Sequence, residues 1–287
     1  MKKVLVTGSS GQLGSEIKVL SDGFSNFEFV FANRLQLSLE NVEKIADFLD
    51  ATQPDYIVNC AAYTAVDKAE SEPELADLVN NKSVGEMAKW SSKNNAKLIH
   101  VSTDYVFDGT SAAALKEDGV TNPQNEYGKT KLRGEQAALK ANPATIIIRT
   151  SWVYSEFGNN FVKTMMRLMT ERDSLNVVDD QIGSPTYAKD LAEAILTIIT
   201  GRKWRGGIYN FSNEGEISWF DFAIAIKEVA GLNCEVSGIP SLQFPTPAKR
   251  PAYSLLDKSK IKATFDVKVP AYEVSLRECL DKLITKI

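Results

Sequence analysis

The sequence lacks the features that would assign it to a membrane, to a disulfide-stabilised protein or to nucleic acid. None of its apolar runs approaches the roughly 20 residues that a bilayer-spanning helix needs, and the run after Lys3 is too short for a secretory signal. The three cysteines lack C-x-x-C spacing, and we expect them to be reduced in a cytoplasmic protein: Cys60, Cys234 and Cys279. A net charge of -4 with interspersed signs offers no basic face for a phosphate backbone. We therefore expect neither a membrane nor a nucleic acid as partner.

The chain does have an ordinary globular composition, in which short apolar runs alternate with longer amphipathic segments. Hydrophobic residues make up 44% and charged residues 24%, so a sizeable core can form. Such alternation predicts right-handed βαβ crossovers and a parallel sheet with helices on both faces. The strands are expected at 3–7, 27–32, 56–60, 97–102 and 145–149, and the helices at 12–20, 41–51, 73–94 and 126–141.

A glycine-rich turn follows the first expected strand and opens the first expected helix. Its spacing is G-x-x-G-x-x-G. The first glycine permits the tight turn, the second lets the backbone approach a pyrophosphate, and the third lets helix and strand pack closely. The helix N-terminus adds N–H donors and a partial positive charge. We therefore predict a Rossmann-like doubly wound sheet, with a dinucleotide held by the turn residues Gly8, Ser10, Gly11, Gln12, Leu13 and Gly14.

The end of the second expected strand bears on the choice of cofactor. In NAD enzymes an acidic side chain there usually binds the adenosine ribose, but this chain has Asn33 and Arg34. A guanidinium could pair with the 2′-phosphate of NADP, although Arg34 could equally be a solvated loop cation. The pattern favours NADPH and leaves NADH possible.

After residue 149 the alternation loosens at glycine-, asparagine- and proline-rich breaks. These lie at 158–160, 183–185 and 245–247. We predict a dinucleotide-binding domain at 1–150 and a smaller, mostly substrate-binding C-terminal lobe at 151–287, with a soft boundary. The strand at 207–211 and the helix at 219–230 are expected to return to the sheet.

The strongest acid–base candidates are Tyr127 and Lys131, one helical turn apart on the same face. A tyrosine normally ionises near pH 10, and a neighbouring ammonium favours the phenolate. Thr103 follows the fourth expected strand, at the edge where ligands of open α/β sheets bind, and could polarise a carbonyl there. This combination predicts proton transfer to or from a carbonyl oxygen.

These motifs resemble those of the extended short-chain dehydrogenase/reductase superfamily, whose triad is Ser/Thr, Tyr and Lys. Further segments closely resemble the dTDP-4-dehydrorhamnose reductase family, and the likeness runs over nearly the whole chain. These segments are Asn-Cys-Ala-Ala-Tyr-Thr-Ala-Val-Asp-Lys-Ala-Glu at 59–70, the run at 102–109, Arg-Thr-Ser-Trp-Val-Tyr at 149–154, Asp-Gln-Ile-Gly-Ser-Pro-Thr at 180–186 and Lys-Arg-Pro at 249–251.

The resemblance implies NAD(P)H-dependent reduction of the 4-keto group of dTDP-4-dehydro-L-rhamnose to dTDP-L-rhamnose, with Thr103, Tyr127 and Lys131 as the catalytic triad. It implies cofactor contacts by the turn, by Asn33 and Arg34, by the triad tyrosine and lysine, and by Ala61, Ala62 and Tyr63. It implies substrate contacts by Thr64, Val66, Thr103, Asp104, Tyr105, Trp152, Asn160 and Arg250. Core packing for Trp152, a surface place for Arg250 and a structural role for His100 stay open.

The sequence departs from the family at its metal site. Some members form dimers around magnesium held by glutamates, one after the glycine turn and one after the Ser-Pro-Thr motif. Glu16 fits the first place, but Lys189 occupies the second, and an ammonium repels a metal ion. We therefore expect no metal, and a monomer or a metal-free homodimer.

Two other functions remain compatible with the sequence. Another nucleotide-sugar reductase or an epimerase would keep the same turn and triad. A non-catalytic regulatory subunit could keep the fold and a bound dinucleotide.

Overall fold

A six-stranded parallel sheet forms the centre of the computed structural model, which describes residues 1–285. The strand order β10-β5-β4-β3-β1-β2 changes direction between β1 and β3, which is where open α/β sheets bind ligands. The doubly wound sheet predicted from the sequence is therefore confirmed, and the strand expected at 207–211 does return to it. The strands are β1 (Lys2–Thr7), β2 (Phe27–Ala32), β3 (Tyr56–Asn59), β4 (Lys97–Thr103), β5 (Ile146–Thr150) and β10 (Gly207–Asn210).

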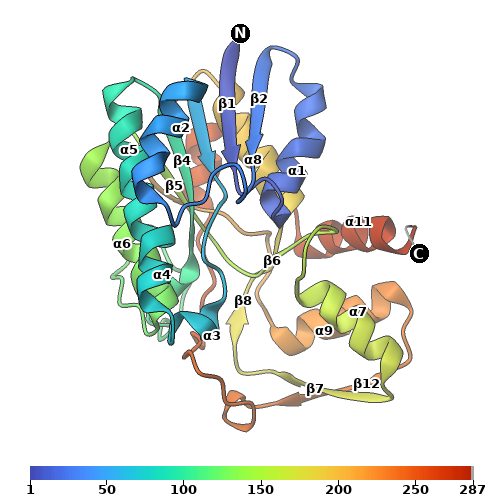
Figure 1. Ribbon diagram of the computed structural model, residues 1–287. Helices are drawn as coiled ribbons and strands as arrows, with labels where there is room; N and C mark the ends of the chain where they lie inside the picture. The colour runs from blue at the N-terminus through green and yellow to red at the C-terminus, as the bar shows by residue number, and fades with distance from the viewer. Residues whose placement is uncertain (286–287) are drawn as a thin grey trace.

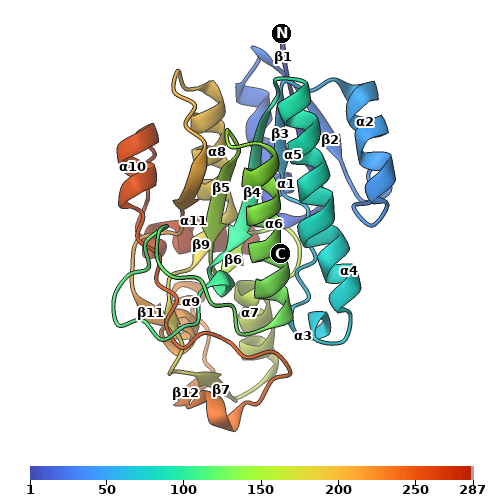
Figure 2. The ribbon, with the colours of Figure 1, turned by 90° about the vertical axis from the view of Figure 1, so that its left-hand side faces the viewer.

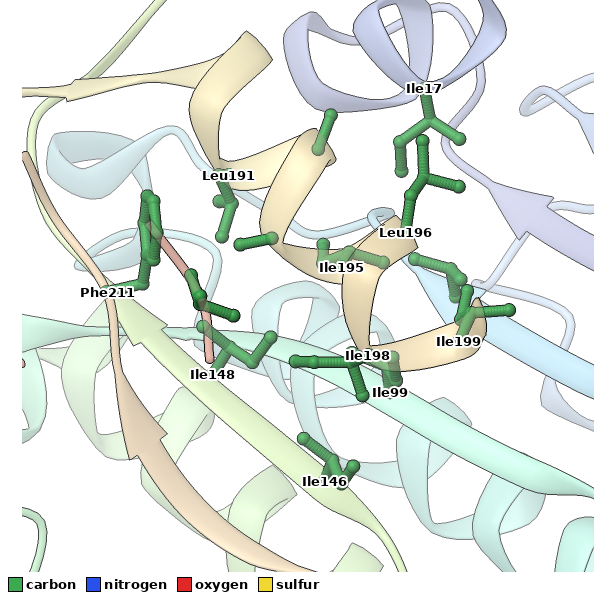
Figure 3. Packing of buried hydrophobic residues seen from close by; sticks show 14 of the residues in the cluster. Ile17, Ile99, Ile146, Ile148, Leu191, Ile195, Leu196, Ile198, Ile199 and Phe211 are labelled. Atoms are coloured by element: carbon green, nitrogen blue, oxygen red, sulfur yellow. The ribbon is translucent and has the colours of Figure 1, made fainter. Parts of the chain in front are cut away.

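Helices cover both faces of this sheet (Figure 1). One face carries α1 (Gln12–Leu20), α8 (Ala188–Thr200) and α10 (Ser259–Phe265). Figure 3 shows α8 laying Leu191, Ile195 and Ile198 toward the isoleucines of β4 and β5. The other face carries α2 (Ile45–Thr52), α4 (Pro73–Asp77), α5 (Ser83–Lys93) and α6 (Glu126–Ala141). Because both faces are covered, the strand interiors read as continuous apolar runs.

The single helix expected at 73–94 is divided in the structure. A π-helical segment, Leu78–Lys82, separates α4 from α5 and places the carbonyl of Asn80 against α6. A Cβ at Gly134 would lie 2.0 Å from that carbonyl oxygen, so only glycine allows this approach. Such π-segments often mark functional sites.

The smaller lobe lies below the carboxyl edge of the sheet in Figure 1 and has its own core. It contains α7 (Phe161–Glu171), α9 (Trp219–Ala230), α11 (Tyr272–Ile284) and the paired strands β7 (Ser174–Val178) and β12 (Glu235–Ile239). The sequence predicted the bounds of α9 but not its place. Its buried side chains Phe222, Ala223 and Ile226 pack in the lobe, not on the sheet.

The remaining elements are short, and β6 and β9 pair with each other between the two parts (Figure 2). These elements are α3 (Val66–Ala69), β6 (Val153–Tyr154), β8 (Ile182–Gly183), β9 (Thr186–Tyr187), β11 (Ile217–Ser218) and the 3-10 turns Ser21–Gly23, Val42–Lys44, Asp104–Val106 and Ser241–Gln243. Within residues 1–285, no helix has the length and apolar character needed to cross a membrane.

Candidate active site

The glycine turn between β1 and α1 has the shape that a dinucleotide pyrophosphate requires. Gly8 has φ +63°, and a Cβ there would lie 2.7 Å from the Ala61 nitrogen. A Cβ at Gly14 would meet the Gly8 oxygen at 2.5 Å, so this glycine allows α1 to pack on the turn. Gly11 is the N-cap of α1 and no side chain caps the helix, so its first N–H groups can bind an anion. The turn therefore fits the predicted cofactor.

The loop after β2 holds the two residues expected at the adenosine ribose. The Asn33 side chain accepts hydrogen bonds from the backbone nitrogens of Leu35 (2.9 Å) and Gln36 (3.2 Å), which fixes the turn. Arg34 is exposed and pairs with Glu40. Glu40 would compete with a 2′-phosphate for this guanidinium, and the assignment of Arg34 stays a prediction.

The loop after β3 carries the expected cofactor contacts Ala61, Ala62 and Tyr63, all partly exposed. The buried amide of Asn80 fixes this loop: it accepts from the Tyr63 nitrogen (2.9 Å) and donates to the Tyr63 oxygen (3.1 Å) and to Thr130 Oγ1 on α6 (3.1 Å). Asn80 was not predicted from the sequence, and the break in its helix is visible only in three dimensions.

The residues of the predicted triad lie at the carboxyl edge of the sheet, where Thr103 and Tyr127 interact and Lys131 lies one turn further along α6. Thr103 ends β4, while Tyr127 and Lys131 project from the first two turns of α6. The Thr103 and Tyr127 side chains are joined by a hydrogen bond. Asn125 caps α6 by accepting from the Gly128 nitrogen at 2.8 Å, which sets the start of the helix that carries both residues.

The charges of the pair differ from the sequence expectation. Burial raises the pKa of Tyr127 to about 12, so its hydroxyl is protonated at neutral pH. The expected lowering of this pKa by Lys131 is absent, because the lysine Nζ is directed to β4, where it donates to the Val101 oxygen at 2.6 Å. Burial lowers the pKa of Lys131 to about 8, although the Glu135 carboxylate opposes that shift.

A buried ion pair supports α6 from behind. Arg149 of β5 donates to both oxygens of Glu135, at 2.9 and 2.7 Å, and the hydroxyl of Ser102 donates to Glu135 at 2.5 Å. Both charged side chains are about 2% exposed or less. Glu135 lies one turn beyond Lys131 on α6. The Arg149–Glu135 ion pair therefore fixes α6, and the Glu135 carboxylate favours the ammonium form of Lys131. The sequence did not identify Glu135 as part of the site.

Asp104 and Tyr105 follow Thr103 in a 3-10 turn and lie beside the triad. The Tyr105 ring packs edge-to-face on the Tyr127 ring, with centroids 5.6 Å apart. Asp104 Oδ1 accepts from Thr103 Oγ1 at 3.0 Å, whereas Oδ2 is buried without a partner among residues 1–285. Burial raises the pKa of Asp104 to about 6, against opposing interactions with Ser254 and Thr103. An unpaired buried carboxylate oxygen here suits a ligand hydroxyl.

The remaining predicted substrate contacts lie on two sides of this region. Val66 begins the short helix α3, and Thr64 lies in the loop just before it. Trp152 stacks on Trp219 at 3.7 Å between centroids and has φ +49°, a strained conformation for a non-glycine residue. Asn160 caps α7 and donates to Gln12 Oε1 at 3.0 Å, which joins the lobe to the glycine turn.

Arg250 lies in a strap that crosses from the lobe to the sheet domain. It forms a two-pronged ion pair with Asp67 of α3, at 3.1 and 2.9 Å, and Asp67 also accepts from the Ala248 nitrogen at 3.1 Å. Asn125 donates to the Lys249 oxygen at 2.7 Å, which ties the same strap to the start of α6. Arg250 is therefore not a free surface cation, and Asp67 is a partner that the sequence did not predict.

The residues at the family's magnesium position do not fit a metal ion. Lys189 pairs with Glu278 at 2.6 Å and Glu193 at 3.5 Å. Glu16 is buried against Ser155, whose hydroxyl donates to it at 2.6 Å, and against Glu156. Burial and Glu156 raise the pKa of Glu16, so it is held as a neutral acid. Within residues 1–285 no cluster of three His, Cys, Asp or Glu side chains could hold a metal.

Comparisons with known proteins agree with this geometry. The family described as RmlD substrate binding domain matches residues 1–285. A dTDP-4-dehydrorhamnose reductase of Aggregatibacter actinomycetemcomitans is 40% identical over 287 residues, covering 96% of this chain and 98% of the relative. A crystal structure of such a reductase from Clostridium acetobutylicum has TM-score 0.94 and 39% identity, and covers 98% of this chain and 99% of its own. A Bacillus anthracis dTDP-4-dehydrorhamnose reductase in complex with NADP has TM-score 0.94 and 36% identity, and covers 98% of this chain and 100% of its own.

Proposed function

Because the chain belongs to the RmlD substrate-binding-domain family of dTDP-4-dehydrorhamnose reductases, we propose that it reduces the 4-keto group of dTDP-4-dehydro-L-rhamnose to dTDP-L-rhamnose with NADPH. The observation that carries the proposal is the contact of Thr103 with Tyr127, one helical turn from Lys131, at the sheet edge that also holds an open glycine turn. Relatives over nearly the whole chain bear this name, which supports the choice of sugar.

The chain's residues divide between holding the cofactor and moving a proton. The turn at 8–14, the loop at 61–63 and the side chains of Tyr127 and Lys131 would hold NADPH. NADPH, when bound, supplies the hydride that the keto carbon accepts. Tyr127, protonated at neutral pH, gives its proton to the keto oxygen, and Thr103 holds that oxygen by a hydrogen bond. Lys131 lies one helical turn from Tyr127, and its Nζ is held at β4 by the Val101 oxygen.

The sugar nucleotide is assigned to the region of Asp104, Trp152 and Arg250. Asp104 offers its unpaired carboxylate oxygen to a sugar hydroxyl. Trp152 offers its indole ring to the sugar. Stacking on Trp219 holds this residue in its strained backbone conformation. Arg250, whose Nη1 and Nη2 donate to Asp67, keeps its Nε–H and the second Nη2–H as donors suited to a diphosphate.

An assay with purified chain tests the proposal. NADPH oxidation should depend on added dTDP-4-dehydro-L-rhamnose, and chromatography should show dTDP-L-rhamnose as the product. UDP-linked keto sugars and an epimerase assay without added NADPH serve as controls. Faster turnover of another nucleotide sugar, or no turnover together with tight binding to a larger enzyme, would contradict the proposal.

We also propose that the enzyme works in the cytoplasm, where its cofactor and nucleotide-sugar substrate are made, as a monomer or a metal-free homodimer. The pairing of Lys189 with glutamates supports the metal-free part of this proposal.

A further inference from the structure

A row of buried polar side chains crosses the sheet behind the triad. Thr7, Asn59 and His100 are register partners on the adjacent strands β1, β3 and β4. Each is 1% exposed or less, and His100 is the only histidine of the chain. Thr7 Oγ1 lies 2.6 Å from Asn59 Oδ1, so the row is hydrogen-bonded from its first member.

The row ends on the lysine of the triad. Asn59 Nδ2 lies 3.0 Å from His100 Nδ1, and Lys131 Nζ lies 3.3 Å from His100 Nε2. The same Nζ donates to the Val101 oxygen at 2.6 Å. The histidine is therefore the link between the sheet interior and the catalytic helix.

Counting hydrogens restricts how this link can work. A neutral imidazole has one N–H donor and one acceptor nitrogen. If Asn59 Nδ2 donates to Nδ1, the ring hydrogen lies on Nε2 and faces an ammonium that has no acceptor. If the amide is turned over, Nδ1–H donates to Asn59 Oδ1 and Nε2 accepts from Lys131, while Asn59 Nδ2 donates to Thr7. Only the second arrangement gives the charged lysine an acceptor at Nε2. The orientation of the Asn59 amide is therefore chosen from the hydrogen-bond network.

We propose that His100 is a positioning residue for the reduction: as the neutral Nδ1–H tautomer, it accepts a hydrogen bond at Nε2 from the Lys131 ammonium. His100 and the Val101 carbonyl then use two of the three ammonium donors, and the third stays free for a ligand. The catalytic consequence rests on the proposed function, whereas the tautomer does not.

The charges around the pair agree with this assignment. The titratable groups that face Lys131 are His100 from β4 and Glu135 from its own helix, with Tyr127 one turn earlier. Burial and the Lys131 charge hold the pKa of His100 well below its usual range, so the ring is neutral. The buried lysine loses hydration, and a neutral acceptor compensates part of that loss without adding charge.

The single histidine makes the tautomer directly measurable. Protein labelled with ¹⁵N-histidine should give one pair of ring nitrogen signals, with the proton on Nδ1 and no titration between about pH 6 and about pH 8.5. This measurement needs neither substrate nor turnover. A proton on Nε2, or a ring that titrates in this range, would overturn the proposal.

Two variants of similar polarity separate positioning from packing. In His100→Gln the amide oxygen can reach the place of Nε2, whereas in His100→Asn the shorter side chain reaches only Asn59. We expect His100→Gln to keep most of kcat and its pH profile. His100→Asn should lose about 10- to 100-fold in kcat, the equivalent of one hydrogen bond to a charged group. Its alkaline limb should move down by about one pH unit, because Lys131 loses its acceptor.

Ile99→Val, a mild change at a buried neighbour on β4, is the control for packing, and its pH profile should match the wild type. Identical pH profiles for the two His100 variants would contradict positioning, even if both lose stability. If the wild type reduces no keto sugar, the proposed function is wrong. The tautomer of His100 is still decided by the ¹⁵N measurement, which needs no turnover.

Discussion

At the scale of single residues, Tyr127 is the group on which the proposed chemistry depends. Its hydroxyl is protonated at neutral pH and is hydrogen-bonded to Thr103, and it lies on the same helix face as Lys131. Tyr127→Phe should lower kcat by about 10²- to 10⁴-fold, the usual contribution of general acid catalysis, while NADPH binding stays nearly unchanged. Stopped-flow hydride transfer and NADPH titration check this. Retention of more than about a tenth of wild-type turnover would remove Tyr127 from the mechanism.

Asp104 is the residue where function and stability should conflict. Its pKa in the folded protein is raised to about 6 by burial, above the usual value of 3.8 for an aspartic acid. The stabilising contribution of the protonated acid is thus full below about pH 3.8 and is lost as the pH rises through about 6. Asp104→Asn should therefore raise the free energy of unfolding by about 1–3 kcal/mol above pH 6 and by little at pH 4.

The same variant should lower kcat/KM by about 10- to 100-fold, because a sugar hydroxyl loses a charged acceptor. Urea unfolding at both pH values and steady-state kinetics test the two halves separately. An equal stability change at pH 4 and pH 7 would show that the Asp104 charge is not responsible.

The residue scale also shows what the sequence alone could and could not predict. The places of Thr103, Tyr127 and Lys131 were predictable because Tyr127 and Lys131 are four positions apart on one helix and Thr103 follows a strand. Their catalytic roles stay a prediction. His100, Asn80 and Glu135 were not, because their partners lie 31, 17 and 14 positions away along the chain. Their roles depend on strand register and helix packing, which no local pattern encodes.

At the scale of elements, we expect the loop after β2 to affect the choice between NADPH and NADH. Arg34 is exposed and paired with Glu40, so the guanidinium is held near the end of β2 by a carboxylate that a 2′-phosphate must displace. Arg34→Ala should lower kcat/KM for NADPH by about 3- to 10-fold and leave NADH unchanged, the range expected for one exposed charged contact. Glu40→Gln should change NADPH use in the opposite direction. Equal effects on both cofactors would exclude a contact with the 2′-phosphate.

The bounds of α1, α6 and α9 agree with the sequence expectation because each begins at a recognisable residue: the glycine turn before α1, and the N-caps Asn125 of α6 and Ser218 of α9. The position of α9 could not be predicted, since its apolar face would suit either the sheet or the lobe. The π-segment at 78–82 was also not predictable, because it accompanies a close approach of Asn80 to Gly134, which lies on another helix. The bounds of a helix can thus be predicted from the local sequence, whereas its packing depends on contacts with residues far away in the chain.

At the scale of the whole molecule, the sheet domain and the lobe are joined around the site by polar contacts. Gln12 on α1 donates to the Val153 oxygen at 3.3 Å and accepts from Asn160, while the Arg250 strap reaches Asp67. These contacts bring together residues that are more than 140 positions apart in the sequence. The domain boundary near residue 150 stays a prediction. Three elements that follow it in the sequence, β10, α8 and α10, belong to the sheet domain.

The region around Glu16 and Lys189 decides whether the molecule depends on a metal. Lys189 and Lys282 already bind Glu278, at 2.6 and 3.2 Å, and Lys282 also pairs with Glu156 at 3.3 Å. A magnesium ion needs several free oxygen ligands, and here the carboxylates are paired with ammonium groups or share a buried proton. Activity should therefore be unchanged in EDTA, and magnesium should not alter the mass measured by light scattering. Lys189→Glu supplies the matched comparison, because it restores a carboxylate at this position. Loss of wild-type activity in EDTA, or a dimer that forms only with magnesium, would show that the lysine does not exclude the metal.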